Sequence, residues 1–271
     1  MNAPTAPTEH LALNRAQRQA QVVAALSAVL PAHALLWQAE DTTPYECDGL
    51  TAYRQRPLVV ALPETEAQVQ AVLQTCHALA VPVVARGAGT GLSGGAMPHA
   101  LGVTLSLAKF NRILKVDAYS RTAVVQAGVR NLAISEAAAP YGLYYAPDPS
   151  SQIACTIGGN VAENSGGVHC LKYGLTVHNV LKVRGYTVEG EPIEFGSDAL
   201  DASGYDLLSV FIGSEGMLAV TLEVTVKLVP KPILARCIMA SFDDLRKAGD
   251  AVAAVIAAGI IPAGLEMMDK T

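Results

Sequence analysis

PVVARGAGTGLSGGA, residues 82–96, places five glycines within nine residues, directly after a short apolar run. Residues 82–85 are small and partly β-branched, which predicts a strand. The loop that follows exposes many backbone N–H groups, because glycine adopts backbone angles closed to other residues. Such a loop forms a concave nest suited to an anion such as a pyrophosphate. Arg86, at the end of the strand, is expected to add a fixed positive charge; the alternative is a long flexible turn.

The composition restricts the class of protein. The 271 residues, 51% of them hydrophobic, suffice for one large or two smaller domains. The net charge of -5 and the lack of a basic stripe argue against a nucleic-acid surface. Residues 1–10 lack the pattern of a secretory signal, and the apolar stretch 251–264 is too short to span a bilayer. We expect a soluble, cytoplasmic chain, and attachment to a membrane through a partner stays open.

The five cysteines are odd in number and scattered, with no Cys-x-x-Cys pair; they are Cys47, Cys76, Cys155, Cys170 and Cys237. This usage is typical of a reducing compartment and argues against a disulfide framework. It also argues against an iron–sulfur cluster held on this chain, because cluster ligands usually come in tight runs.

Hydrophobic spacing predicts the elements that precede the glycine loop. Residues 1–13 are expected to be a loose tail, followed by a helix from Asn14 that Pro31 ends. Residues 58–61 are expected to form a buried strand, and Thr65 and Gln68 have the spacing of a capping box at the start of a helix. With the strand at residues 82–85 these segments make a β-α-β unit. The glycine loop then lies at the carboxyl end of its second strand, where ligands bind in open α/β sheets.

After the glycine loop the pattern changes to short β-branched runs. We predict an antiparallel meander from residues 102–107, 113–116 and 122–126, and a helix over 131–139. A second long loop is expected at residues 146–167, APDPSSQIACTIGGNVAENSGG, whose prolines favour an extended backbone at its start. Its glycine pairs, hydroxyls and amides suit close approach to a ribityl chain or a ring edge.

The last hundred residues are predicted to contain further strands and a third glycine turn. Residues 180–188 and 192–195 resemble a hairpin, and residues 207–212 form an apolar run that leads into a tight turn at 213–216. A long strand is expected at 218–229. Beyond Pro230 we predict a strand over 233–240, a helix capped by Ser241 and Asp244, and a strand over 260–267. Because such a piece alone leaves an apolar face open to water, we expect a fragment or completion by a partner.

The glycine loop also matches a nicotinamide dinucleotide fingerprint, Gly89-x-Gly91-x-x-Gly94, with Asp117 at roughly the expected distance. That fingerprint requires a helix directly after the glycines, so that its amino terminus faces the pyrophosphate. Here a β-like run follows residues 96–99, so a nicotinamide Rossmann fold is disfavoured.

Four motifs in this order and spacing carry a family resemblance: RGAGTGLSGG at 86–95, PDPS at 147–150, GGN with ENSGG at 158–167, and GSEG at 213–216. Together they resemble the FAD-linked D-2-hydroxyacid dehydrogenases of the vanillyl-alcohol oxidase superfamily. Residues 165–180 and 264–269 are similar to the glycolate oxidase branch of that family. The resemblance covers residues 48–271; Ala219 replaces a glycine common at its position.

The resemblance implies an α+β fold: a PCMH-type FAD-binding domain of two α/β subdomains that clasp FAD, then the start of an α+β substrate (cap) domain. The implied division is an N-terminal tail and helix (1–47), the FAD-binding domain (48–231) and a truncated substrate domain (232–271). The implied reaction oxidises glycolate, or a similar D-2-hydroxy acid, to the 2-oxo acid by hydride transfer to FAD. The implied partners are a related flavin subunit and an iron–sulfur subunit.

Carried over by position, the resemblance implies residues that contact the cofactor. They are Arg86, Gly87, Ala88, Gly89, Thr90, Gly91, Leu92, Ser93, Gly94, Pro147, Asp148, Pro149, Ser150, Ser151, Thr156, Ile157, Gly158, Gly159, Asn160, Ala162, Asn164, Ser165, Gly166, Gly167, Glu215, Gly216 and Val220. No histidine lies within 86–96, so covalent attachment of the flavin there is not expected. The family's catalytic and metal-binding residues are expected beyond Thr271, so no catalytic residue and no metal ligand is assigned.

Several alternatives stay open. His169, Cys170 and His178, with Cys155 upstream, fit no common metal pattern, so a structural role is favoured over a metal site. Glu266 and Asp269 fit an active-site position and a solvated strand end equally well. The function could also be that of a D-lactate or D-2-hydroxyglutarate dehydrogenase, or of a flavin-binding module inactive alone.

Overall fold

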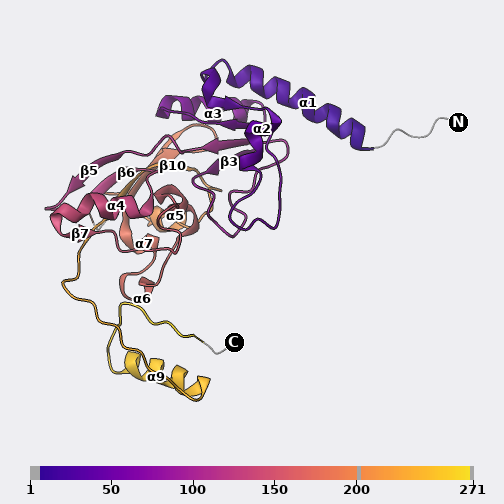
Figure 1. Ribbon diagram of the computed structural model, residues 1–271. Coiled ribbons are helices and arrows are strands. Elements are labelled where there is room, and N and C mark those ends of the chain that lie inside the picture. The colour runs from indigo at the N-terminus through magenta and orange to yellow at the C-terminus, as the bar shows by residue number, and fades with distance from the viewer. Residues whose placement is uncertain (1–6, 200–202, 269–271) are drawn as a thin grey trace.

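Two β-sheets of four and five strands, each with its own hydrophobic core, form the body of the computed structural model (Figure 1). The structure describes residues 7–199 and 203–268. The α+β fold expected from the sequence is confirmed. Among the described helices, none combines the length and apolar character needed to cross a membrane.

The first sheet has the strand order β1-β2-β4-β3. Its strands are β1 (Leu35–Leu36), β2 (Val59–Ala61), β3 (Val83–Arg86) and β4 (Val103–Ser106). Strands β2, β4 and β3 run parallel, and β1 is antiparallel to β2. Helix α3 (Glu66–Ala78) joins β2 to β3 and begins with the predicted capping box of Thr65 and Gln68.

The prediction that residues 102–107 begin an antiparallel meander is wrong. Strand β4 inserts between β2 and β3 and runs parallel to both. All four of its residues are buried, as expected of a strand covered on both faces. A short, fully apolar run shows no alternation of polar and apolar residues. Its pattern therefore does not reveal whether the strand joins a parallel or an antiparallel sheet.

Helix α1 (Pro7–Leu26) covers the first sheet together with α3. It begins before the expected cap at Asn14, so the prediction of a loose tail is wrong for residues 7–13. A proline suits the first turn of a helix, where its missing N–H is not needed. Val22 and Leu26 are fully buried in the core of this half, together with Val69 and Leu73 from α3.

The second sheet is antiparallel throughout, in the order β5-β6-β10-β8-β9. Its strands are β5 (Ile113–Asp117), β6 (Thr122–Gln126), β8 (Val180–Tyr186), β9 (Pro192–Gly196) and β10 (Val220–Lys227). The predicted hairpin is confirmed as β8 and β9, and the predicted long strand as β10. Strand β10 lies in the middle of the sheet although it comes last in sequence, so it ties distant segments together.

Helices α4 (Asn131–Ala138) and α5 (Ile157–Glu163) pack on this sheet. Helix α5 lies inside residues 146–167, so the prediction of a continuous loop is wrong there. Two glycines in its first turn oppose helix formation locally. Burial of Ile157 and Val161 stabilises the helix, and Gly158 is required because a Cβ there would lie 2.8 Å from the Cβ of Ala127.

Short elements connect the larger ones. They are η1 (Ala32–Ala34), α2 (Ala39–Thr42), η2 (Thr43–Tyr45), η3 (Ala139–Tyr141), β7 (Leu143–Tyr144), α6 (Cys170–Tyr173), α7 (Thr176–Asn179), α8 (Leu207–Phe211) and β11 (Val229–Pro230). Strands β7 and β11 pair with each other. The apolar run at 207–212 is thus a short helix before the third glycine turn.

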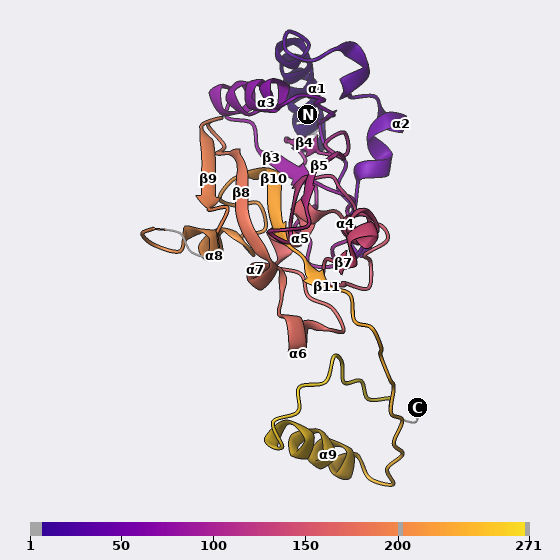
Figure 2. The ribbon, with the colours of Figure 1, turned by 90° about the vertical axis from the view of Figure 1, so that its left-hand side faces the viewer.

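Residues after β11 extend away from the body and carry helix α9 (Leu245–Ala257) (Figures 1 and 2). Of the predicted capping pair Ser241 and Asp244, Asp244 caps this helix by accepting a hydrogen bond from the Arg246 N–H at 2.8 Å. The strands predicted at 233–240 and 260–267 do not form, because a strand needs a hydrogen-bonding neighbour. Asp269 lies outside the described residues.

Candidate functional site

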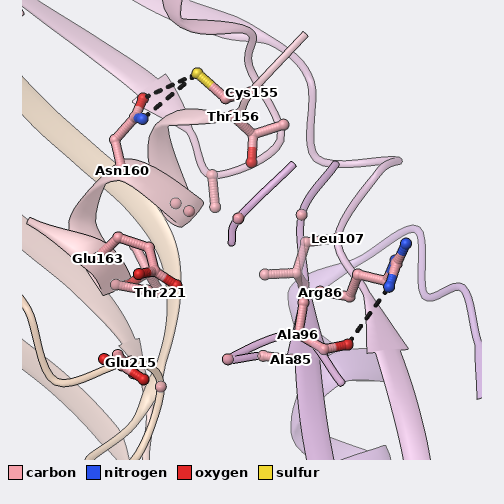
Figure 3. A pocket seen from close by; sticks show the side chains of 18 of the residues that line it. Ala85, Arg86, Ala96, Leu107, Cys155, Thr156, Asn160, Glu163, Glu215 and Thr221 are labelled. Carbon is pink, nitrogen blue, oxygen red and sulfur yellow. Dashed lines mark hydrogen bonds between the residues drawn. The ribbon is translucent and has the colours of Figure 1, made fainter. Parts of the chain in front are cut away.

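Three glycine-containing segments line one cavity of about 150 Å³ (Figure 3). The segments are the loop after β3, residues 151–165 around α5, and the turn at 214–216 that leads into β10. Ala85 and Arg86 of β3 and Val220 and Thr221 of β10 also line the cavity, so it lies between the two sheets.

The predicted cofactor-binding residues divide into two groups. Those that line the cavity are Arg86, Gly87, Ala88, Gly89, Thr90, Gly91, Ser151, Thr156, Gly158, Gly159, Asn160, Ala162, Ser165, Glu215, Gly216 and Val220. Those outside the lining are Leu92, Ser93, Gly94, Pro147, Asp148, Pro149, Ser150, Ile157, Asn164, Gly166 and Gly167. The lining also includes Glu163, Cys155 and Thr221, which the sequence did not assign to the cofactor; Glu163 lies within the ENSGG motif, which was the available signal.

The loop after β3 continues as turns, and no helix occurs within residues 87–102. The requirement of the nicotinamide fingerprint is therefore not met. Gly89 has φ +70°, and a Cβ there would lie 2.2 Å from Arg86 Nη2. A Cβ at Gly87 would lie 2.3 Å from Thr156 Oγ1. The loop thus depends on the absence of side chains at both positions, and its backbone lies directly against the start of α5.

The Arg86 side chain stabilises the glycine loop by hydrogen bonds to backbone carbonyls. Its Nη1 donates to the carbonyl of Ala96 at 3.4 Å (Figure 3) and to that of Cys47 at 2.8 Å. The guanidinium also lies 5.7 Å from the centre of the Tyr45 ring. Burial lowers the pKa of Arg86, and the neighbours Cys47, Tyr45 and Asp48 act in the opposite direction. The guanidinium therefore joins the segment before β2 to the far end of the glycine loop.

Asp48 is the second brace. This buried carboxylate accepts hydrogen bonds from the Leu50 N–H and from the Gly94 N–H, each at 3.0 Å. Next to it, a Cβ at Gly49 would lie 2.7 Å from the carbonyl oxygen of Thr90. No local sequence pattern signals these contacts of Asp48 and Gly49, because their partners in the glycine loop lie more than 40 residues further along the chain.

A buried amide pair positions the other side of the cavity. Asn131 Nδ2 donates to the Pro147 carbonyl at 3.1 Å and to Asn160 Oδ1 at 3.2 Å. Asn160 Nδ2 in turn donates to Cys155 Sγ at 3.5 Å. This network holds the proline-containing segment against α4 and α5.

A dinucleotide fits the chemistry of this lining. Thr156 Oγ1 is buried and has no hydrogen-bond partner, although it lies beside the glycine loop and the start of α5. A buried hydroxyl without a partner is costly, so a ligand that hydrogen-bonds there is favoured. Bare loop amides together with this hydroxyl suit a phosphate group, and FAD supplies two in a diphosphate.

His169 and Asp148 form a hydrogen-bonded pair at the edge of this region. Asp148 Oδ2 lies 2.5 Å from His169 Nδ1, and Asp148 Oδ1 accepts from the His169 N–H at 3.2 Å. Across the described parts of the chain, no three His, Cys, Asp or Glu side chains gather as a metal site would require. The contact with Asp148 gives His169 a structural role, while Glu266 lies exposed.

Comparisons with known proteins agree with this geometry. Residues 57–196 match the family model described as FAD binding domain, and residues 231–271 match that of the FAD linked oxidases, C-terminal domain. The chain is 64% identical over 249 residues to the glycolate oxidase subunit GlcD of Escherichia coli K12, covering 92% of this chain and 50% of that protein. It is 38% identical to the D-lactate dehydrogenase of Archaeoglobus fulgidus, covering 78% of this chain and 47% of that protein.

A solved structure of alkyldihydroxyacetonephosphate synthase superimposes with a TM-score of 0.77 at 21% identity, covering 90% of this chain and 47% of that one. This likeness concerns the fold. The chain spans about half the length of the curated relatives it matches.

Proposed function

The chain belongs to the family of the FAD binding domain, which matches residues 57–196, and from this we propose that it is the FAD-bearing part of a glycolate oxidase subunit. The reaction is the oxidation of glycolate to its 2-oxo acid. The observation that carries the proposal is the 64% identity to the glycolate oxidase subunit over 92% of the chain. The proposal includes the cofactor-binding residues given above and the division of the chain at about residues 48 and 232.

The chain's own residues contribute binding and orientation. The amides of the loop after β3 hold the diphosphate, with Arg86 and Asp48 keeping that loop in shape. Asn131 and Asn160 fix the opposite wall, so the cofactor is held between two rigid surfaces. When bound, FAD supplies the hydride acceptor.

The partners we propose are a related flavin subunit and an iron–sulfur subunit, in a cytoplasmic complex that reaches a membrane through those partners. The support is that the relative is itself a subunit by name, and that the cysteines described here are all free and scattered. Co-purification with tagged partner subunits tests this; a chain that stays alone while fully reducing its acceptor contradicts it.

The test of the function separates binding from turnover. The chain is reconstituted with FAD, its visible spectrum is recorded, and glycolate, D-lactate or D-2-hydroxyglutarate is added without oxygen. The same is done with a chimera that continues into the second half of the Escherichia coli subunit. We expect both proteins to be yellow, and glycolate to bleach the chimera faster than the other two acids do.

A chimera bleached fastest by D-lactate or D-2-hydroxyglutarate favours the second candidate, a dehydrogenase for that acid; the support for it is the 38% identity to a D-lactate dehydrogenase. A yellow chimera that no 2-hydroxy acid bleaches identifies a flavin-binding module without turnover. A colourless protein contradicts all of these functions.

A further inference from the structure

One edge of the second sheet is strongly acidic. Residues 185–226, which run from β8 through β9 and α8 into β10, contain no lysine, arginine or histidine. Their eight acidic residues are Glu189, Glu191, Glu194, Asp198, Asp201, Asp206, Glu215 and Glu223, of which Asp201 lies outside the described residues. All 19 lysines and arginines of the chain lie elsewhere, so the negative net charge comes from this stretch.

Cations from the neighbouring strand β8 neutralise only part of this charge. Lys182 Nζ lies 2.6 Å from a carboxylate oxygen of Asp198. Arg184 is shared between Glu223 at 3.1 Å and Glu194 at 3.9 Å. Ion pairs of this kind are weak where water reaches them, and the Asp198 side chain is 80% exposed. The edge therefore stays negatively charged.

Large apolar side chains lie exposed on the same edge. Helix α8 packs on β9, with the ring centres of Phe211 and Phe195 5.5 Å apart. It leaves Leu207 50% and Val210 64% exposed, and residues three apart lie on one side of a helix. Tyr205, just before the helix, is 93% exposed. Apolar side chains that gather on a surface in this way mark an interaction site, whereas single exposed ones do not.

We name this surface the α8–β9 face; it consists of the apolar side chains of Tyr205, Leu207 and Val210 and the exposed acidic side chains of Glu194, Asp198 and Asp206. Figure 2 shows α8 and β9 on the side of the body away from the point where the chain leaves β11. The described residues after β11 therefore leave the face open. On its inner side the same segment lines the cavity, through Phe211 and Ser214.

We propose that the α8–β9 face docks a partner protein that presents lysine and arginine side chains around an apolar centre. The three apolar side chains supply the dry centre of such an interface, and the carboxylates pair with basic groups at its rim. Opposite charge also speeds the encounter and disfavours wrong partners. A second copy of this chain does not fit, because a symmetric pairing through this face brings two acidic rims together.

The inference deepens the proposed function, since it rests on assembly with the two partner subunits proposed above. It names the surface through which one of them binds. A partner on this face lies one short helix away from the candidate cofactor cavity, because α8 contributes Phe211 to the cavity lining.

The experiment measures binding of each partner subunit, produced separately, to the chain and to the chimera described above, without substrate. The variants are Leu207→Ser combined with Val210→Ser, which removes apolar groups from the centre, and Asp198→Asn, which lowers the charge of the rim. The double variant is expected to bind one of the subunits about tenfold more weakly, because buried groups at the centre supply most of the affinity. Wild-type association with that subunit should slow about tenfold from low to high salt, and Asp198→Asn should reduce this dependence.

Two matched controls lie on other surfaces. Tyr119→Ser changes a fully exposed side chain in the turn between β5 and β6, at the opposite edge of the same sheet. Asp250→Asn removes an exposed charge from α9. Both should bind as the wild type does. Thermal unfolding verifies that every variant is folded, and the double variant should match the wild type because Leu207 and Val210 are exposed.

Four results overturn the proposal. Equal binding of the wild type and the double variant to both subunits removes the face from the interface and leaves the assembly itself intact. A wild-type chain and chimera that bind neither subunit contradict the assembly as well. A dimer of the chain that the double variant abolishes assigns the face to a second copy. Protection of the amides of residues 205–210 from hydrogen exchange in the chimera, relative to the chain alone, assigns the face to the second half of the protein. Because no substrate is used, none of these results bears on glycolate turnover.

Discussion

Asp48 and Gly94 are joined across 46 residues of chain by a hydrogen bond of 3.0 Å, in which the buried carboxylate accepts from the loop amide. The other carboxylate oxygen accepts from the Leu50 N–H, so both oxygens of Asp48 are engaged by backbone. This contact fixes the far end of the phosphate loop before any ligand arrives. A loop with positive φ at Gly89 and Gly94 would otherwise sample many conformations.

Asp48→Asn is expected to destabilise the chain by about 1–3 kcal/mol, because one amide NH₂ must then face a backbone N–H donor. FAD affinity should fall as well, since the loop has to be ordered on binding. Urea unfolding and fluorescence titration with FAD measure the two effects. The control is Asp250→Asn on the exposed side of α9. Equal behaviour of the two variants contradicts a bracing role for Asp48.

Gly87→Ala is expected to weaken FAD binding strongly. The new methyl group would lie 2.3 Å from Thr156 Oγ1, so either the loop or the start of α5 must shift. Overpacking of this kind costs roughly 1–3 kcal/mol, which corresponds to a loss of affinity of about five- to 150-fold. Gly249→Ala, which has open space around it within α9, is the control and should be neutral or slightly stabilising. Full FAD affinity in Gly87→Ala would show that the glycine loop and Thr156 do not lie this close together in solution.

Arg86→Lys tests whether the hydrogen-bonding geometry of the guanidinium or its positive charge is what the loop requires. Lysine keeps the positive charge but lacks the planar fork that reaches the carbonyls of Cys47 and Ala96. We expect a loss of stability of about 1–3 kcal/mol together with weaker FAD binding. If Arg86 acted on the phosphates by charge alone, the lysine variant would bind FAD normally. Thermal unfolding and FAD titration at two salt concentrations distinguish the two cases.

Local chemistry allowed much of the fold to be predicted from the sequence. The capping box at Thr65 and Gln68, the β8–β9 hairpin and the glycine loop each depend on residues close together in the chain, and each is confirmed. What the sequence did not reveal depends on contacts between distant residues. Strand β4 joins the first sheet because β2 and β3 flank it, and α5 forms although its glycines oppose a helix.

The candidate site also contains residues that the sequence predicts and residues that it does not. The glycine segments have motifs, so their convergence on one cavity could be expected. Asp48 and Glu163 act through partners 46 and more residues away, and no spacing rule reports such a contact. The strands expected at 233–240 and 260–267 do not form, because a strand pattern is realised only when another strand is present to pair with it.

The stability of the FAD-free chain against unfolding should change with pH because of Glu163. Burial raises the pKa of this carboxyl, with Glu215 and Asp48 adding to the effect and a hydrogen bond from Ser93 opposing it. A carboxyl with a raised pKa binds its proton more tightly in the folded chain than in the unfolded one. Its stabilising contribution is therefore complete below the unfolded pKa of about 4.3 and is lost as pH rises through the higher folded value.

Glu163→Gln removes this titration, since the amide resembles the protonated acid. Unfolding midpoints of the two FAD-free proteins should agree best at about pH 4. At pH 8 the glutamine variant should be the more stable one, because its side chain carries no charge beside Glu215 and Asp48. Urea titrations from acid to alkaline pH measure the difference, with Glu191→Gln as the control that should follow the wild type. If the wild type instead gained stability over the glutamine variant as pH rises, Glu163 would be stabilised as a carboxylate in the free chain, and its charge would already have a partner before FAD binds.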